Sequence, residues 1–227
     1  MTRITEQLAG LRERIRSAAE LAGRNNDSVT ILAVSKKQPL DSIRAALAVG
    51  LQDFGENYLQ DALPKIVEID SSARWHFIGA IQSNKTRAIA ENFTWVHTIG
   101  SRRIAERLSA QRPSEAGELQ ACIQIQPANA DERGGVQADQ LFELADAISE
   151  LPRIRLRGLM IMPLPNLSNA DSRREFARTR ELLGDLIQRG HDVDTLSMGM
   201  SADLEAAVME GSTIVRIGTD LFGPRPG

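Results

Sequence analysis

Residues 29–55 read VTILAVSKKQPLDSIRAALAVGLQDFG, and this stretch holds the repeating unit from which we predict the fold. A run rich in β-branched and apolar residues (29–35) is followed by an amphipathic stretch (40–49) and then by a second short apolar run (51–55). A helix between two strands lets the chain return along the same sheet, so the two strands lie parallel. The stretch therefore predicts an α/β protein.

The same alternation continues to the end of the chain. Further β-rich runs, which bring the total to eight, occupy residues 75–79, 94–99, 119–126, 154–161, 193–197 and 213–217. Amphipathic segments that predict helices separate them, at residues 57–69, 84–92, 102–111, 137–151, 173–188 and 202–209. Ahead of the first run, Ile4, Leu8, Leu11 and Ile15 recur at helical spacing and predict an extra N-terminal helix.

Eight strand–helix units favour a closed barrel. Each unit averages about 25 residues, which is near the lower size limit of a (β/α)8 barrel. No Gly-x-Gly-x-x-Gly pattern follows residues 29–35, where a dinucleotide-binding sheet would carry it. We therefore predict a single domain over residues 1–227, a TIM-type (β/α)8 barrel with an extra N-terminal helix. A doubly wound open sheet is the alternative.

Composition excludes several classes of protein. The chain has 227 residues, 42% of them hydrophobic and 25% charged, which is typical of a globular protein with a buried core. A net charge of −3 without a basic run argues against nucleic acid as the partner, and no apolar stretch has the ~20 residues of a membrane span. The single cysteine, Cys122, lies in an apolar run and is expected to be buried, as in a cytoplasmic protein.

In a parallel barrel, functional residues follow the carboxyl ends of the strands. Ser201, Gly218 and Thr219 follow the last two strands, where barrels often bind phosphate through backbone N–H groups and hydroxyls. These residues predict an anion site. A more common role for Ser201 alone is to cap the helix predicted over residues 202–209.

Lys36 follows the first strand. Closure of the barrel would bring it close to Arg216 on the eighth strand, because neighbouring strands lie about 4.8 Å apart. Alternation along the strand places Val34 and Lys36 on the inward face and Lys37 on the other. Imine formation by Lys36 requires burial or a nearby cation such as Lys37 or Arg216. The alternative is an ordinary solvated lysine.

Seven segments together resemble one family, that of the pyridoxal phosphate homeostasis proteins, and the resemblance runs from the first helix to Phe222-Gly223. The segments are Leu32-Ala-Val-Ser-Lys36, Phe54-Gly-Glu-Asn-Tyr58, Trp75-His-Phe-Ile-Gly79, Gln82-Ser-Asn-Lys85, Arg157-Gly-Leu-Met160, Leu196-Ser-Met-Gly-Met-Ser201 and Val215-Arg-Ile-Gly218.

The resemblance implies the barrel fold of the alanine racemase N-terminal domain, a monomer or weak dimer, and pyridoxal 5′-phosphate (PLP) held as a Schiff base. It implies a carrier that keeps free PLP low and passes it on, with PLP-dependent client enzymes as candidate recipients, without dedicated catalysis. By the same resemblance, Lys36 is the Schiff-base lysine, Ser201, Gly218 and Thr219 hold the phosphate, Arg216 faces the pyridine nitrogen, and Asn57, His76 and Met200 line the pocket.

One departure from the family pattern concerns the loop after the fifth strand. Family members often carry a lysine there, whereas this chain has Asn129-Ala-Asp-Glu-Arg133. Arginine cannot form an imine, so a transfer of PLP through a second lysine in this loop is in doubt.

Three alternatives remain at this point. A PLP-dependent racemase or another lysine-imine enzyme would need a positioned acid or base, for which His76 is the only obvious candidate. A metal site finds no support, because His76, His97 and His191 lie on separate elements. A pure interaction protein could use the mixed-charge helices at 102–111 and 173–188, although such faces are usually just solvated.

Overall fold

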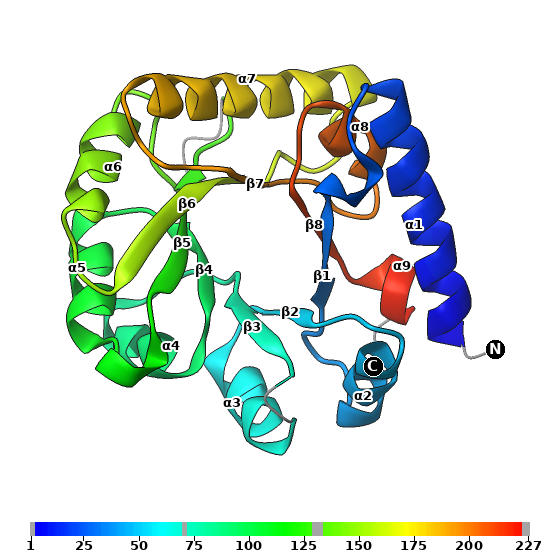
Figure 1. Ribbon diagram of the computed structural model, residues 1–227, viewed down its shortest axis with the longest axis horizontal. Helices are drawn as coiled ribbons and strands as arrows, with labels where there is room; N and C mark the ends of the chain where they lie inside the picture. Colours follow the sequence, from blue (N-terminus) through cyan, green and yellow to red (C-terminus); the bar gives the residue numbers. More distant parts are fainter. Residues whose placement is uncertain (1–2, 70–71, 129–133, 224–227) are drawn as a thin grey trace.

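The computed structural model describes residues 3–69, 72–128 and 134–223, and its eight parallel strands close into a barrel (Figure 1). The strands are β1 (Thr30–Val34), β2 (Asp53–Glu56), β3 (Arg74–Phe77), β4 (Trp95–Ile99), β5 (Leu119–Ile125), β6 (Ile154–Ile161), β7 (Thr195–Ser197) and β8 (Ile214–Ile217). Closure is carried by the pairing of β1 with β8, in which Leu32 lies opposite Arg216. The predicted barrel is confirmed, and the open sheet is excluded.

Helices surround the barrel, and the predicted N-terminal helix packs against two elements near the end of the chain, α8 and α9 (Figure 1). The α-helices are α1 (Arg3–Leu21), α2 (Leu40–Ala48), α3 (Leu59–Glu68), α4 (Thr86–Asn92), α5 (Arg102–Gln111), α6 (Leu141–Ser149), α7 (Asn169–Gln188), α8 (Leu204–Met209) and α9 (Thr219–Phe222). Short 3-10 turns lie at η1 (Asn26–Ser28), η2 (Ser83–Lys85) and η3 (Ser114–Ala116).

The main differences from the predicted elements lie at helix starts. Helix α7 begins at Asn169, four residues before the predicted start, because the Ser168 hydroxyl accepts the N–H of Asp171 at 3.1 Å and caps the helix. The segment predicted over residues 84–92 divides into η2 and α4. The early start of α7 results from this cap, which the spacing of hydrophobic residues cannot predict.

Strand alternation divides the core into two parts. Ile31 and Ala33 of β1 belong to the large apolar cluster between the strands and the helices. Leu32 points into the barrel, where an added Cβ on Gly55 would lie 3.3 Å from its side chain. The predicted inward and outward faces of β1 are therefore present, and Cys122 is buried as predicted.

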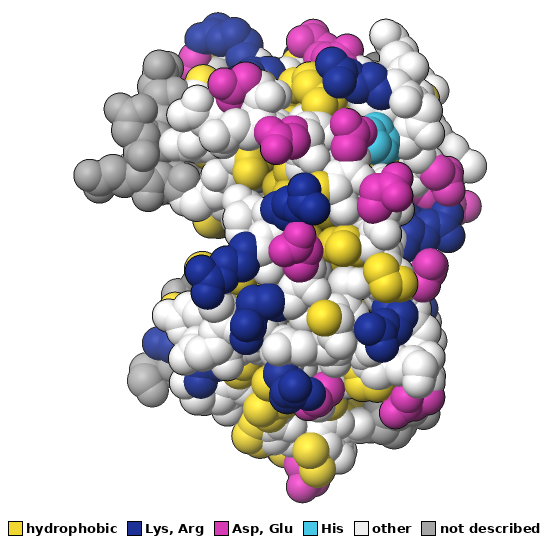
Figure 2. All heavy atoms as spheres, turned by 90° about the vertical axis from the view of Figure 1, so that its left-hand side faces the viewer, with side chains coloured by type: hydrophobic (Ala, Val, Ile, Leu, Met, Phe, Trp, Pro, Cys, Tyr) yellow, Lys and Arg dark blue, Asp and Glu magenta, His cyan; other side chains and the backbone are white. Residues whose placement is uncertain are grey.

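Charges on the outside of the barrel are mixed in sign. Figure 2, which faces the side formed by α4, α5 and α6, shows acidic and basic side chains interspersed over this surface. Several of them form ion pairs between exposed side chains, as Arg102 and Glu106 do one helical turn apart. None of the helices within the described ranges has the length and hydropathy needed to cross a membrane.

A buried ion pair supports the turn that follows β1. The Lys65 Nζ on α3 lies 2.8 Å from Glu56 Oε1 and donates to the Ser35 carbonyl at 2.8 Å. The Ser35 hydroxyl donates to the same Glu56 oxygen at 2.6 Å. Burial raises the pKa of Glu56, although the bonds from Lys65 and Ser35 oppose that shift. This network holds the backbone of Ser35, the residue directly before Lys36.

Replacing Lys65 by Met should lower the free energy of unfolding by about 3–5 kcal/mol, because it leaves the Glu56 carboxylate buried without its cation. Urea denaturation at neutral pH measures this loss. The double variant Glu56→Gln/Lys65→Met should recover much of it, since no charge then remains buried. Arg44→Met, which breaks an exposed pair with Asp41, is the control and should cost less than about 1 kcal/mol. A Lys65→Met loss no larger than this control would contradict the expectation.

Candidate functional site

A cavity of about 470 Å³ opens at the carboxyl ends of the strands. Its lining includes seven of the eight residues that the sequence predicts for a site: Lys36, Asn57, Met200, Ser201, Arg216, Gly218 and Thr219. These residues follow β1, β2, β7 and β8 or lie at the end of β8, so parallel strands and barrel closure bring them together. The eighth, His76, is not among the lining residues that the structure describes.

Lys36 lies in the turn directly after β1. It is partly buried, and Val34 lines the same cavity, as the alternation along β1 predicts. Lys37 is exposed and adopts a positive φ of 60°, which turns the chain away from the strand direction. The N–H of Gln38 bonds to the Ser35 carbonyl at 2.9 Å and closes this turn. The inward lysine is thus held between a strand end and a closed turn.

Arg216 forms one wall of the cavity and is fixed by its neighbours. Its Nη1 donates to the Ser197 carbonyl at 2.6 Å, and its Nη2 donates to the Ile161 carbonyl at 2.9 Å. Burial lowers the pKa of Arg216 to about 10, against the opposing influence of the Asp203 carboxylate. The guanidinium therefore remains charged at neutral pH.

The two loops that carry Ser201 and Thr219 are joined by a residue from α1. Arg14 donates to Glu205 on α8 at 2.6 Å, to Asp220 on α9 at 2.7 Å and to the Ser201 carbonyl at 2.9 Å. The hydrogen bond that Arg14 donates to Glu205 raises the pKa of Arg14 most, and burial opposes it. One cation thus neutralises two carboxylates beside the Ser201 and Thr219 loops.

Ser201 is not the helix cap that its sequence context suggests. Helix α8 begins at Leu204, and the cap position belongs to Asp203. The Asp203 carboxylate accepts the Met200 N–H at 2.6 Å and holds the turn between β7 and α8. The capping interpretation of Ser201 was wrong because the helix starts two residues later than the apolar pattern indicates.

Asn57 offers a buried acceptor at the cavity. Its Oδ1 atom is buried and has no hydrogen-bond partner within the described ranges of the chain. Its backbone approaches the end of β3 so closely that a Cβ on Gly79 would lie 2.0 Å from the Asn57 carbonyl oxygen. Only glycine fits at position 79, and an unpaired buried amide oxygen is the kind of group that a ligand can satisfy.

His76 lies inside the barrel rather than at its mouth. Its Nε2 is 3.0 Å from Asp53 Oδ1, and its Nδ1 is 2.9 Å from His97 Nε2. Its ring stacks on that of Trp95, and burial lowers the pKa of His76. The structure therefore does not place this imidazole where it could act as an acid or base in the cavity.

Sequence patterns did not indicate several residues that organise the site. Arg14, Glu56 and Lys65 act through contacts between distant segments, and no local spacing identifies them. The sequence could have indicated Asp53 as a partner of His76. Strand alternation places residues 53 and 55 on the inward face of β2, and β2 pairs with β3, which carries the inward His76.

The loop 129–133, with Arg133, lies outside the described residues. Beside it, Gly134 lines the cavity and accepts a hydrogen bond from Gln124 at 2.7 Å. Within residues 3–69, 72–128 and 134–223, no group of three or more His, Cys, Asp or Glu side chains is arranged to hold a metal ion.

Comparison with known proteins identifies relatives over almost the whole chain. The family described as "Alanine racemase, N-terminal domain" matches residues 7–226. The pyridoxal phosphate homeostasis protein of Pseudomonas aeruginosa is 52% identical over 226 residues, which cover 99% of this chain and 97% of that protein. The protein of the same name from Escherichia coli K12 is 45% identical over 232 residues, covering 99% and 98%.

Solved structures agree with these relatives. PipY of Synechococcus elongatus PCC7942, solved with PLP bound, is 35% identical and superposes with a TM-score of 0.81, covering 94% of this chain and 100% of PipY. Alanine racemase from Corynebacterium glutamicum shares the fold at 18% identity and a TM-score of 0.69, covering 97% of this chain and 62% of the racemase. The chain therefore belongs to the family of pyridoxal phosphate homeostasis proteins, which is built on the N-terminal domain of alanine racemase.

Proposed function

We propose that this chain binds PLP in the cavity at the barrel mouth and contributes to PLP homeostasis as a carrier, without dedicated catalysis. The observation that carries the proposal is the convergence of Lys36, Arg216 and the hydroxyls of Ser201 and Thr219 on one cavity. The names of the relatives and the PLP-bound structure of PipY support it.

The residues present fit the chemical groups of PLP. When bound, PLP supplies an aldehyde, and we propose that the Lys36 Nζ condenses with it to form a Schiff base and release water. Ser201, Thr219 and the backbone around Gly218 offer hydrogen-bond donors for a phosphate. Arg216 offers N–H groups to the pyridine nitrogen, and the unpaired Asn57 Oδ1 offers an acceptor.

The lining of the cavity favours a carrier over an enzyme. Among the lining residues that the structure describes, the side chains that ionise are Lys36 and Arg216, and His76 is turned into the barrel. A guanidinium with a pKa of about 10 donates a hydrogen bond without releasing its proton at neutral pH. The pyridine nitrogen therefore faces a donor that keeps its proton, which makes PLP a weaker electron sink.

Arg14 supports phosphate binding through electrostatics. A phosphate held by Ser201 and Thr219 would lie near Glu205 and Asp220, both of which are anionic. Because Arg14 forms ion pairs with both carboxylates, it reduces their repulsion of the phosphate.

We propose a single barrel domain over residues 1–227 that acts in the cytoplasm as a monomer or weak dimer, with PLP-dependent enzymes as the recipients of PLP. Nucleic acid and membranes have no part in it. The buried Cys122 is compatible with a reducing compartment.

Incubation with PLP followed by borohydride should fix the cofactor on Lys36, and tandem mass spectrometry of the digested protein locates the adduct. Lys36→Arg should abolish labelling, because a guanidinium keeps the charge but forms no imine. Lys37→Arg is the matched control and should retain the adduct. Labelling of Lys37 in a protein that leaves Lys36 unmodified would reject the assignment. Sustained turnover of an amino acid by the loaded wild-type protein would favour the enzyme instead.

The variants Ser201→Ala and Thr219→Val should each weaken PLP binding about 10-fold or more, because a hydrogen bond to a charged group contributes about 1.5–3 kcal/mol. Binding of pyridoxal, which lacks the phosphate, should stay within about two-fold of wild type. Fluorescence titration measures both affinities. Ser114→Ala, in the exposed η3 turn, serves as the control. Equal losses for PLP and pyridoxal would place the phosphate elsewhere.

A further inference from the structure

A continuous line of polar side chains runs through the barrel from the cavity toward the opposite end. Arg216 Nη1 is 3.0 Å from Ser197 Oγ, which is 2.8 Å from His97 Nδ1. His97 Nε2 is 2.9 Å from His76 Nδ1, and His76 Nε2 is 3.0 Å from Asp53 Oδ1. We call these five residues the interior hydrogen-bond chain.

Polar residues such as those of the interior hydrogen-bond chain are unusual inside a barrel of this fold. The interior of a parallel barrel is ordinarily filled by branched aliphatic side chains. Here Ser197 and His97 are 0% exposed and His76 is 1% exposed. A buried polar group is costly unless it is fully hydrogen-bonded. A fully connected line of buried polar groups therefore indicates a role other than packing of the core.

The two ends of the interior hydrogen-bond chain fix its direction. Arg216 can only donate, and the ionised Asp53 can only accept. Burial opposes ionisation of Asp53, but the hydrogen bonds from Arg74 and His76 outweigh it and lower the pKa of this carboxyl below its usual range. When both imidazoles between the ends are neutral, each residue accepts from the Arg216 side and donates toward Asp53.

With both imidazoles neutral, one arrangement of protons satisfies every contact. Arg216 donates to the Ser197 oxygen, and the Ser197 hydroxyl donates to His97 Nδ1. His97 then donates from Nε2 to His76 Nδ1, and His76 donates from Nε2 to Asp53. In this arrangement both imidazoles carry the proton on Nε2. A further proton on His76 would bring two N–H groups face to face at 2.9 Å unless His97 moved its own proton to Nδ1.

The surroundings of the two histidines agree with neutral rings. Burial lowers the pKa of His97 well below its usual value; the charge of Arg216, and any proton added to His76, act in the same direction, against Asp53. For His76, burial lowers the pKa most, Asp53 raises it and Arg74 lowers it. Arg157 lies over Trp95, the ring on which His76 stacks, 5.2 Å from its centroid.

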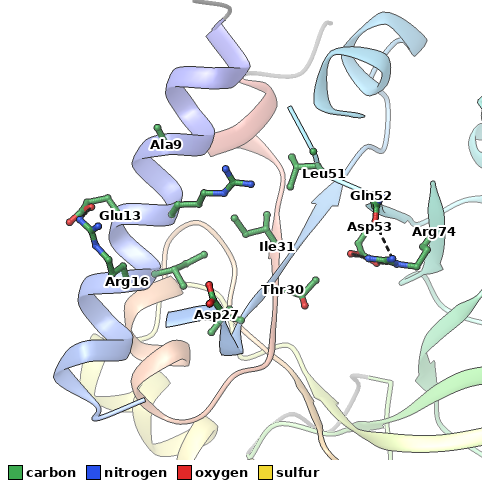
Figure 3. Close-up of a pocket in the computed structure, with 14 residues that line it drawn as sticks. Ala9, Glu13, Arg16, Asp27, Thr30, Ile31, Leu51, Gln52, Asp53 and Arg74 are labelled. Carbon is green, nitrogen blue, oxygen red and sulfur yellow. Dashed lines mark hydrogen bonds and ion pairs between the residues drawn. The ribbon is translucent and has the colours of Figure 1, made fainter. Parts of the chain in front are cut away.

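Asp53, the last residue of the interior hydrogen-bond chain, lines a second cavity. Asp53 and Arg74 form two hydrogen bonds, of 2.8 and 2.7 Å, and both residues line a cavity of about 520 Å³ at the amino ends of β1, β2 and β3. Figure 3 shows this pair on one side of the cavity, opposite Glu13 and Arg16 of α1. The carboxylate that terminates the interior chain is thus anchored by an arginine at the other end of the barrel.

We propose that Ser197, His97, His76 and Asp53 are positioning residues for Arg216. The oriented chain fixes the guanidinium at the cavity wall and connects its charge to a carboxylate at the opposite end of the barrel. The effect on the cofactor rests on the proposed function, because PLP senses the chain only through Arg216. The proton arrangement and the fixation of Arg216 are properties of the protein alone.

The protein without PLP provides the first test. In ¹⁵N-histidine-labelled protein, NMR should assign His76 and His97 as neutral rings protonated on Nε2, unchanged between about pH 5.5 and 8.5. Only three histidines are present, so His76→Gln, His97→Gln and His191→Gln assign every signal. The Nε–H of Arg216, assigned with Arg216→Lys, should exchange faster with solvent in Asp53→Asn than in wild type. A ring protonated on Nδ1, a charged ring at neutral pH, or unchanged Arg216 exchange in a folded Asp53→Asn protein would overturn the proposal.

PLP binding provides the second test. Asp53→Asn and His97→Phe should weaken PLP binding about 10-fold and shift the absorption maximum of the bound cofactor. His97→Gln, which retains a donor and an acceptor, should restore part of both. Asp194→Asn is the matched control, since the hydrogen bonds that the described residues make with Asp194 involve Arg157 and Thr195 and no member of the interior hydrogen-bond chain. This variant should bind PLP within about two-fold of wild type.

The outcomes separate this inference from the proposed function. Folded Asp53→Asn and His97→Phe proteins with wild-type affinity and absorption would overturn it even if wild type binds PLP. If wild type fails to bind PLP at all, the proposed function fails, and the NMR measurements on the protein alone still decide the positioning role. If His97→Phe does not fold, His97→Gln and Asp53→Asn carry the comparison.

Discussion

The hydrogen-bonded pairing of β1 with β8 is the constraint on which the site depends. These strands are separated by most of the sequence, yet their pairing places the turn with Lys36 beside the end of β8 with Arg216, Gly218 and Thr219. In an open sheet the two strands could lie at opposite edges, and the amine of Lys36 and the hydroxyl of Thr219 would not share a cavity. The closed barrel therefore creates this cavity as well as the core.

The sequence predicted this architecture because the relevant signal is local and repeated. Short β-rich runs alternate with amphipathic segments, and each repeat contributes independently to the same conclusion. Strand ends follow from the same pattern, which is why Lys36, Ser201 and Thr219 could be named as neighbours before the structure was known. Strand alternation also predicted that Val34 and Lys36 face inward while Lys37 does not.

Other parts of the site were beyond sequence reasoning because they depend on tertiary contacts. His76 was expected at the pocket, but its depth within the barrel follows from its position on β3 and from the partners Asp53 and His97 on neighbouring strands. Arg14 gives no sequence signal, since its partners Glu205 and Asp220 lie 191 and 206 residues away. Ser201 was open to a capping interpretation because apolar spacing leaves helix starts uncertain by a few residues.

The contact of α1 with α8 and α9 gives the first helix of the chain an importance that its place in the sequence would not suggest. A shortened chain that started at β1 would retain every strand pair, but it would lose Leu8, Leu11 and Ile15 from the hydrophobic core. It would also lose the guanidinium that bridges Glu205, Asp220 and the Ser201 carbonyl. Helix α1 therefore couples the packing of the core to the position of the two loops that follow β7 and β8.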